Sequence, residues 1–249
     1  MWQKKGIRMT SPRSLTTAGG GWALGVGLAA LGYAGLVAYH HTRYGKAVQS
    51  NDDSLLLDRF IPSPEVVEHH RVHIAAPPEV VLTTARGLEV LSSRLVRGIF
   101  KARELVLGSE PDERRLPTAL VPYMQSIGWV VLAERADREI VLGAVTRPWD
   151  AAPIFRSLSP GEFAAFREPG YVKIVWTLRA DPAGEGESMF HTETRAATTD
   201  LETRKRFRHY WSYVAPGVEL IRRAMLQPLK KAAEHRAGQS VVTVARNVH

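Results

Sequence analysis

The stretch from Thr199 to Arg236 constrains the fold most, because it carries a long apolar stripe at helical spacing. The residues of this stripe recur every three or four positions: Phe207, Trp211, Val214, Val218, Ile221, Met225, Leu229 and Ala232. Thr199 and Glu202 have the spacing of a capping box, which predicts that the helix starts there. Pro216 and Pro228 each remove a backbone donor without breaking the stripe, so we expect one bent helix or two nearly collinear pieces.

Basic residues flank this stripe and mostly fall outside it. They are Arg204, Lys205, Arg208, Arg222, Arg223, Lys230, Lys231 and Arg236. The chain of 249 residues carries a formal net charge of +8, which suits anionic partners. We interpret the flank either as a solvated helix face or as a surface for anionic lipid headgroups. No recognition-helix motif lies beside it, so no nucleic-acid partner is expected.

The N-terminal region holds an uncharged run from Ala18 to Tyr39, after a basic arm over residues 1–17. At about 1.5 Å per residue this run forms a helix of about 33 Å, enough to cross a hydrocarbon core of about 30 Å. The run is longer than the apolar core of a cleaved signal peptide, so it predicts a single-pass transmembrane helix over residues 18–39. More basic residues precede the run than follow it, which places the globular domain outside the cytoplasm.

The segment after this run is expected to begin with a linker over residues 40–65, much of which is polar. Alternating apolar and polar residues then predict a strand over residues 66–76. The sequence Pro77-Pro78-Glu79 ends that strand and starts a helix, and a second helix is expected over residues 94–107.

The part of the chain before the long helix is rich in β-forming residues. Strands are predicted over residues 129–134, 139–145, 162–166, 170–180 and 188–198. This order of elements predicts an α+β fold with one domain over residues 66–237, followed by a loose tail over residues 238–249. A curved antiparallel sheet wrapped around the C-terminal helix buries both apolar faces, which is a helix-grip arrangement. If the helix stands off the sheet, a cavity lies between them.

Four segments carry a resemblance to a known superfamily. They are Ile74-Ala75-Ala76-Pro77-Pro78-Glu79-Val80-Val81, residues 163–173 with Pro169-Gly170-Tyr171, Thr192-Glu193-Thr194-Arg195, and the last helix with Tyr210-Trp211 and Ile221-Arg222-Arg223. Over residues 66–236 the chain resembles the START-like, Bet v 1-like (SRPBCC) superfamily of polyketide cyclases and lipid-transfer proteins. The resemblance implies a deep apolar cavity that binds a lipid, a polyketide-like compound or another hydrophobic small molecule. Its members include carriers and enzymes, so the fold leaves the activity open.

His191, Glu193 and Arg195 project from the same side of one predicted strand. If that side faces the cavity, Glu193 and Arg195 pair at its polar end, and His191 is a candidate acid or base. If it faces outward, the three residues form a solvated charge cluster that contributes little to stability. The pattern leaves both alternatives open.

Aromatic residues are further candidates for the cavity wall, although aromatics on an apolar stripe belong more often to the core. They are Tyr123, Trp176, Tyr210 and Trp211, of which Tyr123 is also a catalytic candidate. Among the histidines at 69, 70 and 73, strand alternation separates His70 from the other two, and no carboxylate cluster accompanies them. We therefore expect no metal site. The chain has no glycine-rich phosphate loop, serine elbow or cysteine, so no cofactor is expected either.

These features support three hypotheses for function. The leading one is a membrane-anchored domain that binds a hydrophobic small molecule or lipid without chemistry. The second is an enzyme of the polyketide cyclase or dehydratase type that uses His191, Glu193 or Tyr123 in the same cavity. The third is an interaction module whose cavity is filled by its own side chains.

Overall fold

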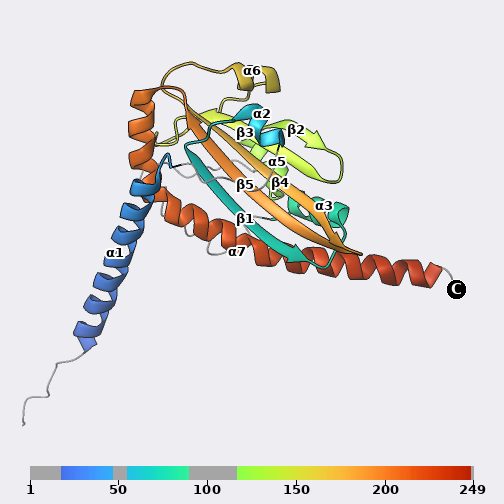
Figure 1. Cartoon of the computed structure of the whole chain (residues 1–249). Helices are drawn as coiled ribbons and strands as arrows, with labels where there is room; N and C mark the ends of the chain where they lie inside the picture. Colours follow the sequence, from blue (N-terminus) through green and yellow to red (C-terminus); the bar gives the residue numbers. More distant parts are fainter. Residues whose placement is uncertain (1–17, 47–54, 90–116, 248–249) are drawn as a thin grey trace, which may run out of the picture.

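The computed structural model of the chain describes residues 18–46, 55–89 and 117–247 (Figure 1). Its elements, in chain order, are α1 (Ala18–Arg43), α2 (Leu55–Phe60), β1 (Val66–Ile74), α3 (Pro78–Arg86), α5 (Leu120–Ser126), β2 (Val130–Arg135), β3 (Glu139–Thr146), α6 (Pro160–Ala165), β4 (Val172–Gly184), β5 (Glu187–Thr198) and α7 (Leu201–Asn247). Five of the six expected strands are confirmed as β1 to β5. The helix expected over residues 94–107 lies outside the described residues.

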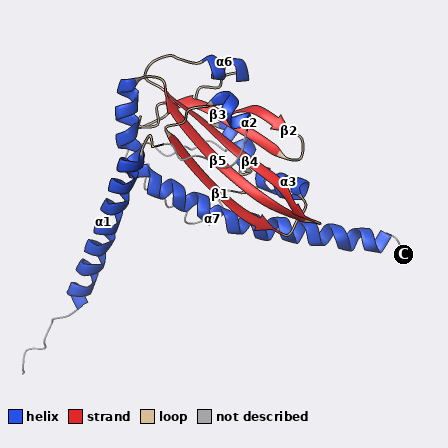
Figure 2. Ribbon diagram, in the orientation of Figure 1, coloured by secondary structure: helices blue, strands red, loops and turns tan. Residues whose placement is uncertain are grey.

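The strands form one antiparallel sheet in the order β1-β5-β4-β3-β2, so the first strand of the chain lies beside the last (Figure 2). Neighbouring residues of β4 show how the two faces are covered. Trp176 packs with residues of α3 and α7, whereas Val175 packs with residues of α2 and α6. The chain therefore has an α+β fold in which the long C-terminal helix covers one face of the sheet, as a helix-grip arrangement requires.

Helix α7 is one element that contains both Pro216 and Pro228. Its first part lies beside α1, and after a bend the longer remainder crosses the sheet (Figure 1). Proline inside a helix is a usual cause of such bending, so the predicted bent helix is confirmed. The helix continues through residues 239–247, which the sequence predicts to be a loose tail.

The N-terminus of α7 is capped one residue later than the sequence predicts. Asp200 Oδ1 accepts a hydrogen bond from the backbone N–H of Thr203 at 2.8 Å, which is the N-cap interaction. Thr199 instead accepts from the backbone N–H of Tyr171 and donates to the carbonyl of the same residue, each at 3.1 Å. The predicted cap at Thr199 is therefore wrong, and Thr199 ties the start of α7 to β4.

The strand expected over residues 162–166 is wrong, because this segment belongs to helix α6. Ser159 caps the helix by accepting from the backbone N–H of Glu162, whose carboxylate accepts in return from the backbone N–H of Ser159. Phe163 is fully buried against the face of the sheet opposite α7, called the outer face below. Ser159 and Glu162 have the spacing of a capping box, which predicts a helix. This short segment was instead interpreted as a strand.

Residues 18–39 form a helix as expected, within α1. Among the residues that the structure describes, however, no helix is long and apolar enough to cross a membrane. The transmembrane helix predicted over residues 18–39 is therefore not supported.

The segment expected to be a linker contains α2, which packs on the sheet. Leu57, Phe60 and Ile61 are buried against the face opposite α7. Helix α2 thus covers strand residues that would otherwise face water. The candidate site residues of β5 lie on this covered face.

Candidate ligand cavity between the sheet and helix α7

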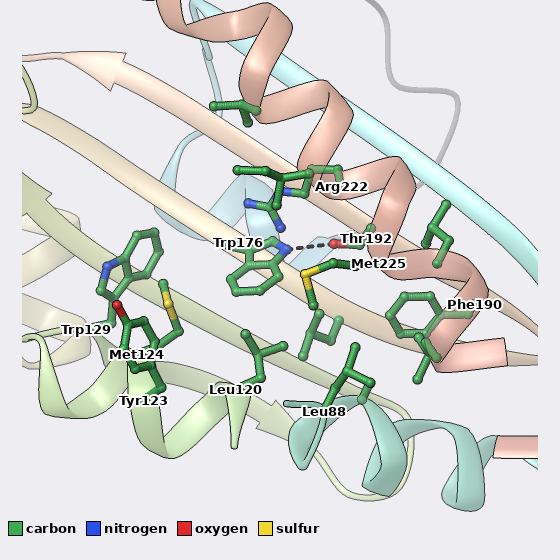
Figure 3. A pocket seen from close by; sticks show the side chains of 16 residues that line it. Leu88, Leu120, Tyr123, Met124, Trp129, Trp176, Phe190, Thr192, Arg222 and Met225 are labelled. Atoms are coloured by element: carbon green, nitrogen blue, oxygen red, sulfur yellow. Dashed lines mark hydrogen bonds between the residues drawn. The ribbon is translucent and has the colours of Figure 1, made fainter. Parts of the chain in front are cut away.

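A cavity of about 210 Å³ lies between the sheet and α7, with α3 and α5 closing its sides (Figure 3). Its wall is mostly apolar, with side chains that include Leu88, Leu120, Met124, Trp129, Phe190 and Met225. Trp176 and Leu178 from β4 and Thr192 from β5 form the sheet side of the wall. The alternation of β4 places these even-numbered residues toward α7.

The charged side chain in this wall is Arg222 of α7. Its guanidinium group donates to Thr194 Oγ1 at 2.8 Å and lies over the Trp176 ring, 4.0 Å from the ring centroid. Trp176 is held in turn, because its indole N–H donates to Thr192 Oγ1 at 2.6 Å (Figure 3). Arg222 therefore has a defined position at one end of an otherwise apolar cavity.

Burial lowers the pKa of Arg222 to about 10, while the carboxylate of Glu68 acts in the opposite direction. Arg222 thus carries a full positive charge at neutral pH. Glu68 lies on β1 directly opposite Thr194 in the sheet. Burial, together with the nearby carboxylate of Glu219, raises the pKa of Glu68 to about 7 against the opposing effect of Arg222. The cavity wall therefore contains one fixed cation, and the carboxyl group of Glu68, which does not line the cavity, lies close enough to Arg222 for each to shift the pKa of the other.

Two of the candidate residues from the sequence line the cavity, Trp176 and Tyr123. Tyr210 and Trp211 do not. They pack against Phe207 at the start of α7, in a cluster that also contains Val172 of β4. These two aromatics belong to the core, as aromatics on a helix stripe usually do.

His191, Glu193 and Arg195 lie on the face of the sheet opposite the cavity, where α2 and α6 pack. Arg195 Nε donates to Glu193 Oε1 at 2.6 Å, and its Nη1 donates to the carboxylate of Asp58, two residues before the end of α2. Glu193 and Arg195 are nevertheless almost completely buried, at 2% and 5% exposure. The pair is therefore neither at the ligand cavity nor in solvent, because α2 covers it.

His191 belongs to a separate polar group on the same outer face. Its ring stacks on that of His69, with the Nδ1 atom 3.4 Å from Nε2 of His69, and its Nε2 lies 3.7 Å from the Asp181 carboxylate. A base in this position has no access to a ligand in the cavity. The structure therefore does not bring the catalytic candidates His191, Glu193 and Tyr123 together.

Arg222 is the site residue that sequence reasoning missed, since it was grouped with the basic flank of the helix. A signal was available. Arg222 lies four residues after Val218 and three before Met225, so it shares the apolar stripe rather than the flank. A single cation on an apolar helix stripe is unlike the other basic residues of α7, and this difference marks it as a residue of the cavity wall.

No family model and no curated protein matches the sequence. Comparison with solved structures finds CalU16 from Micromonospora echinospora, with 11% identity over 70% of this chain and 86% of that chain and a TM-score of 0.24. It also finds the Zhui aromatase/cyclase from Streptomyces sp. R1128, with 15% identity, 69% and 94% coverage and a TM-score of 0.28. For Ara h 8.0201 the values are 9% identity, 70% and 98% coverage and a TM-score of 0.20. All three TM-scores lie below 0.5, so the fold assignment rests on the sheet and helix α7 themselves, and the START-like resemblance stays a prediction that agrees with them.

Proposed function

We propose that this protein binds a small amphipathic molecule, with an apolar body and an anionic group, in the cavity between the sheet and α7. The observation that carries the proposal is Arg222, a charged side chain in an apolar wall. Among the described residues, its guanidinium group donates one hydrogen bond, to Thr194, although it has five N–H groups. A carboxylate or another oxyanion satisfies the remaining donors and neutralises the charge, and such charge-assisted hydrogen bonds are strong.

The volume of the cavity limits the size of this ligand. Sites for drug-sized ligands typically enclose about 300–1,000 Å³, and this cavity encloses about 210 Å³. A short single acyl chain or one to two aromatic rings therefore suits it, whereas a lipid with two long chains does not. The open volume also favours binding over the alternative of an interaction module with a filled interior.

The lining supports binding more than catalysis. General acid–base chemistry needs a proton donor or acceptor within hydrogen-bond reach of the reacting group. Among the described lining residues, the titratable side chains are Tyr123 and Arg222. An enzyme of the cyclase type is the second candidate, and Tyr123 is the group in the wall that it would use. The proposal does not include a membrane anchor.

Calorimetric titration of the full chain with matched probes tests this proposal. Octanoate and octanol share one apolar chain and differ in charge, so we expect octanoate to bind at least about tenfold more tightly, as hydrogen bonds to charged groups contribute about 1.5–3 kcal/mol. Arg222→Gln should abolish this preference. Lys231→Gln, which removes an exposed cation from the same helix, should leave it unchanged. Equal affinity for the two probes, or a preference that survives Arg222→Gln, would contradict the proposal.

A further inference from the structure

Three ligating side chains meet where α1, β1 and α7 come together. His40 lies in the last turn of α1, Glu68 lies on β1 and Glu219 lies on α7. One nitrogen of His40 and one carboxylate oxygen from each glutamate all lie within 4.8 Å of one another. The three residues are far apart in the sequence, so no spacing motif reveals them.

The separation of the ligating atoms agrees with the size of a metal ion. His40 Nε2 and Glu219 Oε1 are 3.5 Å apart, which is longer than an ordinary N–H···O hydrogen bond of about 2.7–3.2 Å. A tetrahedral zinc ion with bonds of about 2.1 Å holds neighbouring ligand atoms about 3.4 Å apart. These two atoms therefore stand at the distance that a shared ion requires, and one oxygen of the Glu68 carboxylate lies within 4.8 Å of both.

Two arginines lie near the cluster, and the charge of each lowers the pKa of Glu68 against the effect of burial. His40 is 7% exposed, and no described residue donates a hydrogen bond to the Glu68 carboxylate. Arg223 approaches the other oxygen of Glu219 at 3.8 Å, but its side chain is 70% exposed and free to move aside. Arg222 acts on Glu68 through its charge, while its guanidinium group donates to Thr194 and lies over the Trp176 ring.

We propose that His40, Glu68 and Glu219 bind a divalent transition-metal ion. Imidazole nitrogen with two carboxylate oxygens is a ligand set that suits Zn²⁺ and Mn²⁺, and zinc agrees best with the observed N···O separation. The ion links α1 to the domain, because its ligands come from α1, β1 and α7. It also lies next to the cavity, since Glu68 pairs in the sheet with Thr194, the acceptor of Arg222.

The test uses the full chain without a histidine tag, treated with chelator and then titrated with Zn²⁺ or Mn²⁺ by calorimetry. We expect one equivalent of metal to bind. Glu68→Gln and Glu219→Gln, which keep the shape of each side chain, should each weaken binding at least about tenfold, by comparison with losses of about 10–100-fold for outer-sphere groups. Metal should also slow hydrogen exchange in the C-terminal half of α1 in the wild-type protein and not in these variants.

Two control variants separate this site from adventitious binding. His41→Gln removes the neighbouring imidazole, whose Nδ1 contacts Ser212 Oγ at 3.1 Å. His73→Gln removes an exposed imidazole paired with Glu187 at 3.0 Å. Both variants should bind one equivalent with wild-type affinity. The proposal is overturned if neither metal binds, or if affinity falls in the control variants while Glu68→Gln and Glu219→Gln keep it.

Discussion

The guanidinium carbon of Arg222 lies 4.0 Å from the centroid of the Trp176 ring, so a cation from α7 rests on an indole of β4. A cation–π contact contributes about 0.5–1 kcal/mol at exposed sites and about 2 kcal/mol or more when it is desolvated. Trp176 is itself fixed by its hydrogen bond to Thr192 at 2.6 Å. The position of the charge in the cavity thus depends on the sheet as well as on the helix.

Trp176→Phe tests this dependence. Phenylalanine keeps an apolar wall but loses the hydrogen bond to Thr192 and weakens the cation–π contact, so we expect the free energy of unfolding to fall by about 1–2 kcal/mol. Urea denaturation measures the change. Trp149→Phe is the matched control, because Arg206 lies 5.0 Å from the Trp149 ring centroid and the Trp149 N–H has no hydrogen-bond partner among the described residues. A larger loss in the control than in Trp176→Phe would contradict this account.

The buried pair on the opposite face predicts a large loss of stability without loss of ligand binding. Arg195→Met removes the guanidinium group that donates to the buried Glu193 carboxylate, and breaking such a pair costs about 3–5 kcal/mol. Replacing both residues, in Glu193→Leu with Arg195→Met, should cost less than the single change. Urea denaturation and calorimetry with octanoate check both statements. A double variant that is less stable than Arg195→Met, or a refolded single variant without octanoate binding, would show that the outer face has another role.

The periodicity of the sequence predicted the helices and strands of this fold more accurately than it predicted the environment of particular residues. Alternation located the five strands, because each has at least one apolar face that must be buried. Alternation did not predict the environment of Glu193 and Arg195, because β5 is covered on both faces. Helix α2 covers the face on which these two residues lie, and it falls in a segment that the sequence predicts to be a linker. Helix α2 has six residues, which is too short to show a helical period in the sequence, and its position depends on tertiary packing.

The candidate site was predicted only in part, for a similar reason. Trp176 and Tyr123 line the cavity and were two of the four aromatic candidates for its wall, whereas the other two belong to the core. Arg222 was not predicted as a site residue because positive charge on a helix usually marks the solvent face, although its spacing from Val218 and Met225 places it on the stripe. The cluster of His40, Glu68 and Glu219 depends on how α1 docks, which no local pattern determines.

Lys173 predicts a dependence of stability on alkaline pH. Burial on the outer face, with a smaller contribution from Arg167, lowers the pKa of Lys173 from 10.5 to about 8. Below pH 8 both states are protonated and the cost of burying the charge is fully present. Between about pH 8 and 10.5 the unfolded chain binds more protons than the folded one, so this residue makes stability rise with pH.

Lys173→Met keeps an unbranched side chain that is one atom shorter and removes the charge from the environment of Phe163 and Ala164. The variant should be more stable than the wild type at pH 7, and the difference should shrink as the pH approaches 10.5. Thermal denaturation at several pH values measures it, with Lys231→Met as a control at an exposed position. A difference that stays constant from pH 7 to 10.5 would mean that Lys173 has an ordinary pKa.

Gly143 of β3 sets how closely α6 approaches the sheet. A Cβ atom at this position would lie 2.9 Å from Cγ of Leu132, closer still to its Cδ1 atom, and 3.3 Å from Cε2 of Phe163. Overpacking of a buried site costs about 1–3 kcal/mol, so Gly143→Ala should lower the free energy of unfolding by that amount. Leu132→Val removes Cδ1, the atom of Leu132 closest to the added Cβ, and should partly restore the stability of Gly143→Ala, which a double-mutant cycle in urea detects. Gly161→Ala in α6, where the added Cβ has no neighbour within 4 Å, should instead be neutral or slightly stabilising. If Gly143→Ala behaves like Gly161→Ala, the close approach of Leu132 and Phe163 to β3 is not a constraint on this packing.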